Sequence, residues 1–262
     1  MRLDKILCFL LDMDGTITLG DHLLPGAHEF IQLLSRRYIQ YFFLTNNSSR
    51  SRKDYSAKLH TLGLEIPTER ILTSGEAAAS TLASRDEGAR IYLVGTPSLQ
   101  REFLDHGFEL SDENPDTVVL GFDTTLTYDK LSRLCSLVRE GTPYIATHPD
   151  LNCPTAEGPI PDIGATIAFV EASTGRVPDE IIGKPFQPMT EVILARTGLE
   201  PAQICMVGDR LYTDIAMGKH GLRTVLVLSG ETQPGDLVES PYKPDLVVKD
   251  IGEIAQLIKD QG

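Results

Sequence analysis

The sequence predicts an α/β protein with mostly parallel strands, on two observations. Short apolar runs that suit buried strands alternate with longer amphipathic segments along all 262 residues. The runs are continuous in hydrophobicity rather than alternating, as in residues 6–11, which is typical of strands covered on both faces. Together these patterns favour parallel strands joined by helices.

The first third of the chain predicts three strands and three helices. Pro25-Gly26 opens a helix, and a second helix begins where Ser51 and Asp54 resemble a capping box and ends at Gly63. The strands are expected at residues 6–11, 39–44 and near 71–72, and the third helix from Gly75 onward.

The rest of the chain continues the same alternation. Thr96-Pro97 suits a helix N-cap followed by proline in the first turn. The middle third predicts strands at 90–94, 117–120 and 143–146 and helices at 96–106, 127–140 and 165–173. The last third predicts strands at 204–207, 225–228 and 246–248 and helices at 188–197 and 251–259.

This order suggests a core built from both ends of the chain with a separate middle lobe. We expect the core to comprise residues 1–78 and 181–262, and the inserted lobe to comprise residues 79–180. A single long sheet is the alternative. The sequence shows neither internal repeats nor low-complexity segments.

The composition indicates a globular protein and narrows its partners. The chain is 41% hydrophobic and 23% charged, with a net charge of −13. This balance argues against binding a nucleic acid polymer or an anionic membrane surface. An acidic protein can still bind phosphate esters if a metal and local donors reverse the field in its site.

The expected location is the cytosol. The N-terminal apolar run is short and followed by acids, unlike a signal peptide, and no run approaches the ~20 residues that span a membrane. The four cysteines, Cys8, Cys135, Cys153 and Cys205, lack paired metal-type spacing. Three of them lie in apolar segments, as expected for core residues of a protein in a reducing compartment.

The strongest functional signal is Asp12-Met13-Asp14-Gly15-Thr16, directly after the first apolar run. Residues two apart in an extended segment point the same way, so both carboxylates can face one site at the carboxyl edge of the sheet. One of the two could bind Mg²⁺ and attack phosphorus while the other gives a proton to the leaving oxygen, whereas an acidic turn is the alternative. Gly15 allows a sharp turn and close approach to a ligand.

Two further segments suit phosphate binding. Thr45-Asn46-Asn47 follows the second strand, where a hydroxyl and backbone N–H groups can hold phosphate oxygens, although a polar turn is the simpler explanation. Lys184, between Gly183 and Pro185, has a constrained backbone and could neutralise a phosphate, although most lysines are only surface charges.

The last signal is the segment 208–214, Gly-Asp-Arg-Leu-Tyr-Thr-Asp, across a predicted strand-to-helix turn. Asp209 is placed to reach a cation, and Asp214 to bind it through water or to orient other groups. Acids near a helix N-terminus are also common without a metal, which is the alternative for Asp214. Together the four segments supply a nucleophile, an acid, a hydroxyl, a cation and metal ligands for phosphoryl transfer.

In order and spacing, these segments resemble the haloacid dehalogenase-like phosphohydrolase superfamily, and more narrowly its NagD/4-nitrophenylphosphatase-type subfamily. The resemblance covers nearly the whole chain and is most specific at residues 208–215 and 225–230. It implies a Rossmann-like parallel-sheet core with an inserted α/β cap domain that closes over the site.

The resemblance also implies roles for the site residues. Asp12 would be the nucleophile and Asp14 the general acid and then base. Thr45, Lys184 and the backbone near Asn46 would bind the phosphoryl group. Mg²⁺ would be held by the Asp12 carboxylate, the Asp14 carbonyl and Asp209, with support from Asp214.

The segments 147–150 and 161–165 resemble the family's substrate loop, with two departures. His148 stands where relatives commonly have Asn, and Asp162 where they have Gly. His148 could contact the leaving group or only cap a strand end, and both alternatives stay open. Together with Asp150, Asn46 and Asn47, it belongs to the expected substrate contacts.

The expected function is therefore a Mg²⁺-dependent phosphatase for small phosphate monoesters. Nucleotide monophosphates, sugar phosphates, phosphoglycolate and pyridoxal phosphate are candidate substrates, and 4-nitrophenyl phosphate an artificial one. A phosphotransferase or phosphomutase, a dehalogenase and a catalytically silent phosphate sensor are weaker alternatives. Relatives often associate through the cap, so a homodimer is an expectation, although the sequence shows no defined apolar seam.

Overall fold

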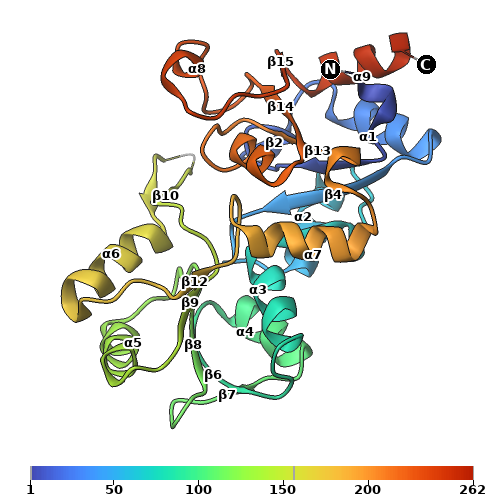
Figure 1. The fold of residues 1–262 in the computed structure, drawn as a ribbon. Helices are drawn as coiled ribbons and strands as arrows, with labels where there is room; N and C mark the ends of the chain where they lie inside the picture. The colour runs from blue at the N-terminus through green and yellow to red at the C-terminus, as the bar shows by residue number, and fades with distance from the viewer. Residues whose placement is uncertain (1, 156, 262) are drawn as a thin grey trace. The chain divides into compact units, whose positions relative to one another are not determined.

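A computed structural model of the protein describes residues 2–155 and 157–261. The predicted core includes residues 1 and 262, and the predicted lobe includes residue 156; these three lie outside the described residues. The chain forms two compact units, each an α/β structure with its own sheet (Figure 1). The first unit comprises Met1–Thr45, Ser56–Leu72 and Ile193–Gly262, and the second comprises Asn46–Tyr55 and Thr73–Val192.

The first unit is built on a six-stranded sheet. Its strand order is β15 (Leu246–Val248), β14 (Arg223–Val227), β13 (Ile204–Gly208), β1 (Cys8–Leu11), β4 (Gln40–Thr45) and β5 (Ile71–Thr73). The pairings from β15 to β4 are parallel. From β1 the chain proceeds to β4 and β5 on one side, whereas β13, β14 and β15 fill the other side. The strand order therefore reverses between β1 and β13, the place where open parallel sheets bind ligands.

Burial explains why these segments form strands. All four residues of β1 and all five of β13 are buried, as expected for central parallel strands. Phe9 of β1 packs edge to face on Phe30, with ring centroids 5.6 Å apart. Phe30 lies on α1 (Ala27–Arg36), which packs beside α9 (Ile251–Gln261). These contacts hold β1 in place and thereby fix the residues that follow it.

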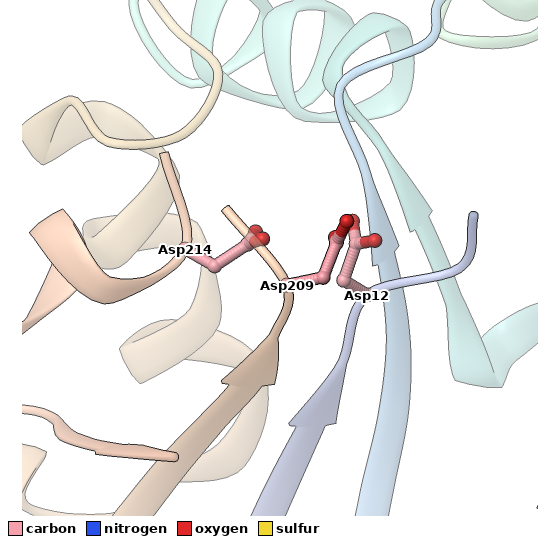
Figure 2. Close-up of side chains that lie close together, drawn as sticks. All are labelled: Asp12, Asp209 and Asp214. Atoms are coloured by element: carbon pink, nitrogen blue, oxygen red, sulfur yellow. The ribbon is translucent and has the colours of Figure 1, made fainter. Parts of the chain in front are cut away.

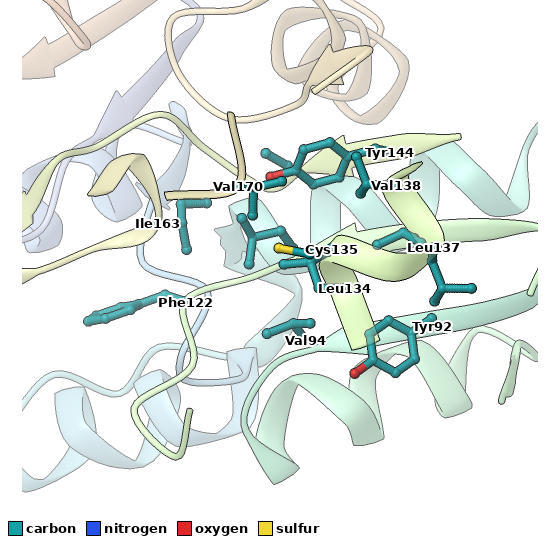
Figure 3. Packing of buried hydrophobic residues seen from close by; sticks show 13 residues of the cluster. Tyr92, Val94, Phe122, Leu134, Cys135, Leu137, Val138, Tyr144, Ile163 and Val170 are labelled. Atoms are coloured by element: carbon teal, nitrogen blue, oxygen red, sulfur yellow. The ribbon is translucent and has the colours of Figure 1, made fainter. Parts of the chain in front are cut away.

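The second unit is built on a five-stranded parallel sheet. Its order is β12 (Glu180–Ile181), β9 (Tyr144–Ala146), β8 (Thr117–Leu120), β6 (Arg90–Val94) and β7 (Glu109–Leu110). One face packs on α5 (Tyr128–Glu140) and α6 (Ile163–Thr174), where Val94, Leu134 and Cys135 are part of a buried cluster (Figure 3). The other helices of the unit are α3 (Ser74–Ala83) and α4 (Pro97–Asp105), which pack on each other.

Short elements complete the two units. Two antiparallel hairpins form, from β2 (Thr18–Leu19) with β3 (His22–Leu23) and from β10 (Asn152–Cys153) with β11 (Ile160–Pro161). The remaining helices are α2 (Arg52–Thr61), α7 (Gln187–Thr197) and α8 (Asp236–Glu239), with 3₁₀ turns at Leu3–Lys5, Thr68–Arg70, Pro201–Gln203 and Ile215–His220. In the described ranges, no helix has both the length and the apolar character needed to cross a bilayer.

The predicted α/β class with a parallel-sheet core is confirmed. The two sheets are separate, so the alternative of one long sheet is wrong. The capping box forms, since Asp54 Oδ2 accepts a 2.8 Å hydrogen bond from Ser51 N while Asp54 N donates to Ser51 Oγ at 3.2 Å. The helix expected after Asp214 is a 3₁₀ helix. The boundaries near residues 78 and 181 stay a prediction, while the compact units divide at other positions.

Candidate functional site

Three aspartates converge at the carboxyl edge of the first unit's sheet (Figure 2). Asp12, Asp209 and Asp214 each offer a carboxylate oxygen, and these atoms all lie within 4.8 Å of one another. Asp12 directly follows β1, and Asp209 directly follows the neighbouring strand β13. The backbone N of Asp12 donates to the Val207 carbonyl at 2.9 Å, which continues the pairing of the two strands into the site.

The electrostatics of this cluster suit a divalent cation. Asp214 is fully buried and Asp209 is 2% exposed, so two acids share a dry environment beside the partly exposed Asp12. Like charges this close are costly unless a cation binds or a proton is shared. Carboxylate oxygens are the donors that Mg²⁺ prefers, with water and phosphate oxygens completing its shell. The residues present therefore fit the expected metal.

Glycines allow the backbone to pack tightly around the acids. Gly15 has a φ of +90°, and a Cβ there would lie 2.5 Å from Asp209 Oδ2. A Cβ on Gly230 would overlap the same carboxylate, and one on Gly208 would overlap the side chain of Asp214. Side chains at these three positions would displace the two buried acids.

Backbone donors orient the same two carboxylates. The N–H of Glu231 donates to Asp209 Oδ2 at 2.6 Å, and the N–H of Arg210 donates to Asp214 Oδ2 at 3.1 Å. Hydrogen bonds of this kind fix the orientation of a carboxylate. The loops after β13 and β14 thus hold the acids as ligands that are ready for a cation.

Asp14 occupies a different environment from the three clustered acids. Its side chain is 42% exposed, and its Oδ1 accepts a 3.2 Å hydrogen bond from Thr18 Oγ1 and lies 3.8 Å from Lys58 Nζ. A carboxyl group at the surface of the site can exchange protons with solvent or a bound group, as a general acid requires. The predicted metal contact through the Asp14 carbonyl stays a prediction.

Thr45 lies at the same sheet edge as Asp12. It is the last residue of β4, which pairs with β1 through Leu11 and Phe43, and it is 5% exposed. The sequence predicts this hydroxyl just after the strand, and the structure has Thr45 as the last residue of the strand. Its contact with a phosphoryl group stays a prediction.

In the second unit, Asn46 joins two of the predicted substrate residues. Its Nδ2 donates to Asp150 Oδ1 and to the Lys184 carbonyl, each at 3.0 Å, and its Oδ1 accepts from Lys184 N at 2.8 Å. Lys184 is 2% exposed, so it differs from the ordinary surface lysine that the sequence left as the alternative. Asn47 Oδ1 accepts from Ser49 N at 2.9 Å and so closes a turn.

His148 is buried in the second unit and has no exposed surface. Its Nε2 lies 3.0 Å from Asp162 Oδ1, and its Nδ1 lies 3.2 Å from the hydroxyl oxygens of Ser74 and Thr147. The two roles that the sequence predicts for His148, contact with the leaving group or capping of a strand end, stay predictions. Neither Ser74 nor the contact between His148 and Asp162 could be predicted from the sequence, because no local pattern brings these residues together.

Comparison with known families and relatives identifies the family of this chain. The model for haloacid dehalogenase-like hydrolases matches residues 9–109, and a HAD-hydrolase-like model matches residues 181–254. The chain is 36% identical to dihydroxyacetone phosphatase of Corynebacterium glutamicum, over 96% of this chain and 92% of the relative.

Solved structures show the same similarity in three dimensions. A 4-nitrophenylphosphatase from Thermotoga maritima superposes with a TM-score of 0.94 at 50% identity, covering 97% of this chain and 98% of that one. A glycerol phosphate phosphatase from Mycobacterium tuberculosis, solved in complex with calcium, gives a TM-score of 0.88 at 31% identity, covering 96% of this chain and 75% of that one.

Proposed function

This chain belongs to the haloacid dehalogenase-like hydrolases, in the NagD/4-nitrophenylphosphatase-type subfamily, and from this premise we propose that it is a Mg²⁺-dependent phosphatase. Its substrates are small phosphate monoesters, and the reaction passes through an aspartyl-phosphate on Asp12. The observation that carries the proposal is the convergence of Asp12, Asp209 and Asp214 at the point where the sheet's strand order reverses.

In the first step, a carboxylate oxygen of Asp12 bonds to phosphorus while the bond between phosphorus and the ester oxygen breaks. Asp14 gives its proton to the departing ester oxygen. In the second step, Asp14 takes a proton from water, the water oxygen bonds to phosphorus, and the phosphorus–Asp12 bond breaks. Inorganic phosphate and both starting carboxyl groups result, so atoms and protons balance.

Asp12, Asp209 and Asp214 would hold the Mg²⁺. When bound, the cation neutralises the clustered acids and the negative charge of the phosphoryl group. The two buried acids favour this assignment, because they have hydrogen-bonded carboxylates and lie in a dry environment. Asp12 is more exposed than the other two, which suits a group that must also meet substrate.

The proposal includes substrate binding by five further residues: Thr45, Asn46, Asn47, Lys184 and Asp150. Asn46 forms hydrogen bonds with Asp150 and with the main-chain N and O of Lys184, which supports a shared role for these three residues. The buried positions of Asn46, Asp150 and Lys184 suit a rigid binding surface rather than a flexible one.

The names of the relatives guide the order in which substrates are tested. They include a dihydroxyacetone phosphatase, a 4-nitrophenylphosphatase and a glycerol phosphate phosphatase, and also an acid sugar phosphatase and a 5'-nucleotidase. We therefore place glycerol phosphate and dihydroxyacetone phosphate at the head of the substrate panel. Nucleotide monophosphates, sugar phosphates, phosphoglycolate and pyridoxal phosphate complete it. The cytosolic location and the homodimer stay predictions from the sequence.

The test is phosphate release from this panel, with Mg²⁺ or with EDTA, for the wild-type protein and Asp12→Asn. We expect release that requires Mg²⁺ and is lost in Asp12→Asn, with the highest kcat/KM marking the substrate class. Phosphate transfer to an added alcohol in preference to water would instead indicate a phosphotransferase. Saturable binding without turnover would indicate a sensor.

A further inference from the structure

His148 and Asp162 of the second unit contact each other. His148 Nε2 and Asp162 Oδ1 lie 3.0 Å apart, although fourteen positions separate them in the chain. His148 is fully buried and Asp162 is 5% exposed, so water cannot take the place of either partner at low cost. Removing either side chain would therefore leave a buried polar group without this partner.

This pair holds Asp150 through its main chain. Asp162 Oδ1 also accepts from Ile163 N at 2.7 Å and so caps α6, whose Gly164 N donates to the Asp150 carbonyl at 2.8 Å. The backbone N of Asp162 donates to the Leu151 carbonyl at 2.9 Å. A Cβ on Gly164 would overlap the Pro149 carbonyl oxygen, which shows how closely the two chain segments approach.

The same histidine holds Asp150 through its side chain. His148 Nδ1 meets Ser74 Oγ, and Ser74 Oγ donates a short hydrogen bond to the Asn46 carbonyl. Asn46 then donates from Nδ2 to Asp150 Oδ1 at 3.0 Å. Asp150 is thus fixed at both its carbonyl and its carboxylate, and both connections lead back to His148.

Two further hydroxyl groups extend this network beyond the histidine. Ser48 Oγ accepts from Phe122 N at 2.9 Å and lies 2.9 Å from Thr147 Oγ1. Thr147 Oγ1 in turn lies 3.2 Å from His148 Nδ1, while His148 Nε2 faces the Asp162 carboxylate. A connected network of buried polar groups rigidifies its surroundings.

We propose that the buried His148–Asp162 pair, joined to Ser74 and Asn46, is a positioning device that fixes Asp150 and thereby sets how tightly substrate is held. The inference rests on the proposed function for the role of Asp150. His148 itself does not touch substrate in this scheme. It acts through the loop that carries Asp150 and through Asn46.

The kinetic test compares KM and kcat for wild type and four variants. These are His148→Ala, His148→Gln, Asp162→Asn and the double variant that combines His148→Ala with Asp162→Asn. Gln can place its amide N–H near the position of Nε2, so it should restore part of the function. We expect KM to rise about tenfold in His148→Ala with kcat within about twofold, and the double variant to be no worse than the more severe single variant. Additive effects, or unchanged KM in both single variants, would overturn the inference.

Hydrogen exchange gives a second readout that needs no activity. Amides of residues 151–164 should exchange faster in His148→Ala than in wild type, while those of α5 keep their rates. The matched control is Asp179→Asn, which alters an ion pair with Arg176 and an acceptor for Tyr144 N at the opposite end of β9. Unchanged exchange in His148→Ala, or the same effect in the control, would contradict the inference.

The two readouts separate the inference from the proposed function. If wild-type protein releases no phosphate from any ester, the proposed function fails, and hydrogen exchange alone decides whether the pair positions the loop. If wild-type protein is active and the variants keep its KM, the function stands and the positioning role fails.

Discussion

Gly208 and Asp214 are packed so closely that a Cβ on the glycine would overlap the carboxyl group of the aspartate. Gly208 ends β13, and Asp214 is one of the three acids at the end of that strand. The side chain of Asp214 therefore requires a glycine at position 208.

Gly208→Ala should weaken metal binding by displacing Asp214. We expect the Mg²⁺ concentration for half-maximal activity to rise about tenfold, a magnitude typical of disturbed groups around a metal. Activity measured against Mg²⁺ concentration checks this. Gly235→Ala is the matched control, because a Cβ there meets no atom within 4 Å. Equal Mg²⁺ dependence in Gly208→Ala and wild type would show that Asp214 does not support the metal.

Mg²⁺ should raise the Tm of the wild-type protein. A ligand that binds only the folded state stabilises it by RT ln(1 + [L]/Kd), about 2.7 kcal/mol at a hundredfold excess over Kd. Removing like-charge repulsion among Asp12, Asp209 and Asp214 is the physical source. Thermal unfolding with Mg²⁺ and with EDTA, in wild type and Asp209→Asn, measures this effect. A similar Mg²⁺ shift in both proteins would place the cation elsewhere.

Glu102 should make the protein less stable as pH rises. Burial, followed by the nearby charge of Glu76, raises the pKa of Glu102 from 4.5 to about 7, against the opposing effects of Arg52 and His106. The folded state thus binds more protons than the unfolded state between pH 4.5 and 7. The stabilisation is complete below pH 4.5 and is lost as pH rises through 7.

Glu102→Gln should remove this pH dependence. Gln can still accept the 2.9 Å hydrogen bond from Arg52 N that Glu102 Oε1 accepts. Relative to the variant, the free energy of unfolding of wild type should fall by up to about 3 kcal/mol between pH 4.5 and pH 8, at 1.36 kcal/mol per pKa unit. Urea unfolding at several pH values measures the difference. Parallel stability curves for the two proteins would contradict the assigned pKa.

Leu134→Ala should destabilise the second unit. Leu134 is fully buried in the cluster between α5, α6 and the sheet (Figure 3). Truncation leaves a cavity that costs about 2–5 kcal/mol of unfolding free energy. Denaturant unfolding measures this cost. Leu126→Ala is the control, because Leu126 is 38% exposed and should change stability by less than about 1 kcal/mol. Similar losses in both variants would argue against this core.

Asp12 and Asp209 of the first unit could be predicted as site acids because each follows a strand that the sequence marks clearly. Asp12 comes directly after a buried apolar run, and Asp209 directly after another. Parallel strands bring their carboxyl ends to one edge, so local patterns predicted a tertiary cluster. The strands of three or more residues could also be predicted, because their apolar runs are long enough to be recognised in the sequence.

The rest depends on contacts that no local pattern shows. Gly230 packs against Asp209, and Ser74 reaches His148, only through the folded chain. The hairpin of β10 and β11 has strands of two residues, too short for a hydrophobic period. The burial of Lys184 likewise follows from packing, because apolar neighbours such as Ile182 and Phe186 do not by themselves predict that a lysine is buried.

The proposed mechanism is tested by identifying the residue that carries phosphate during turnover. Protein quenched during hydrolysis of the best ester is treated with borohydride, which reduces an aspartyl-phosphate to homoserine, and then mapped by mass spectrometry. We expect homoserine at position 12 in wild type with Mg²⁺, and none with EDTA or in Asp12→Asn. Reduction at another residue, or turnover by a folded Asp12→Asn at the wild-type rate, would contradict it.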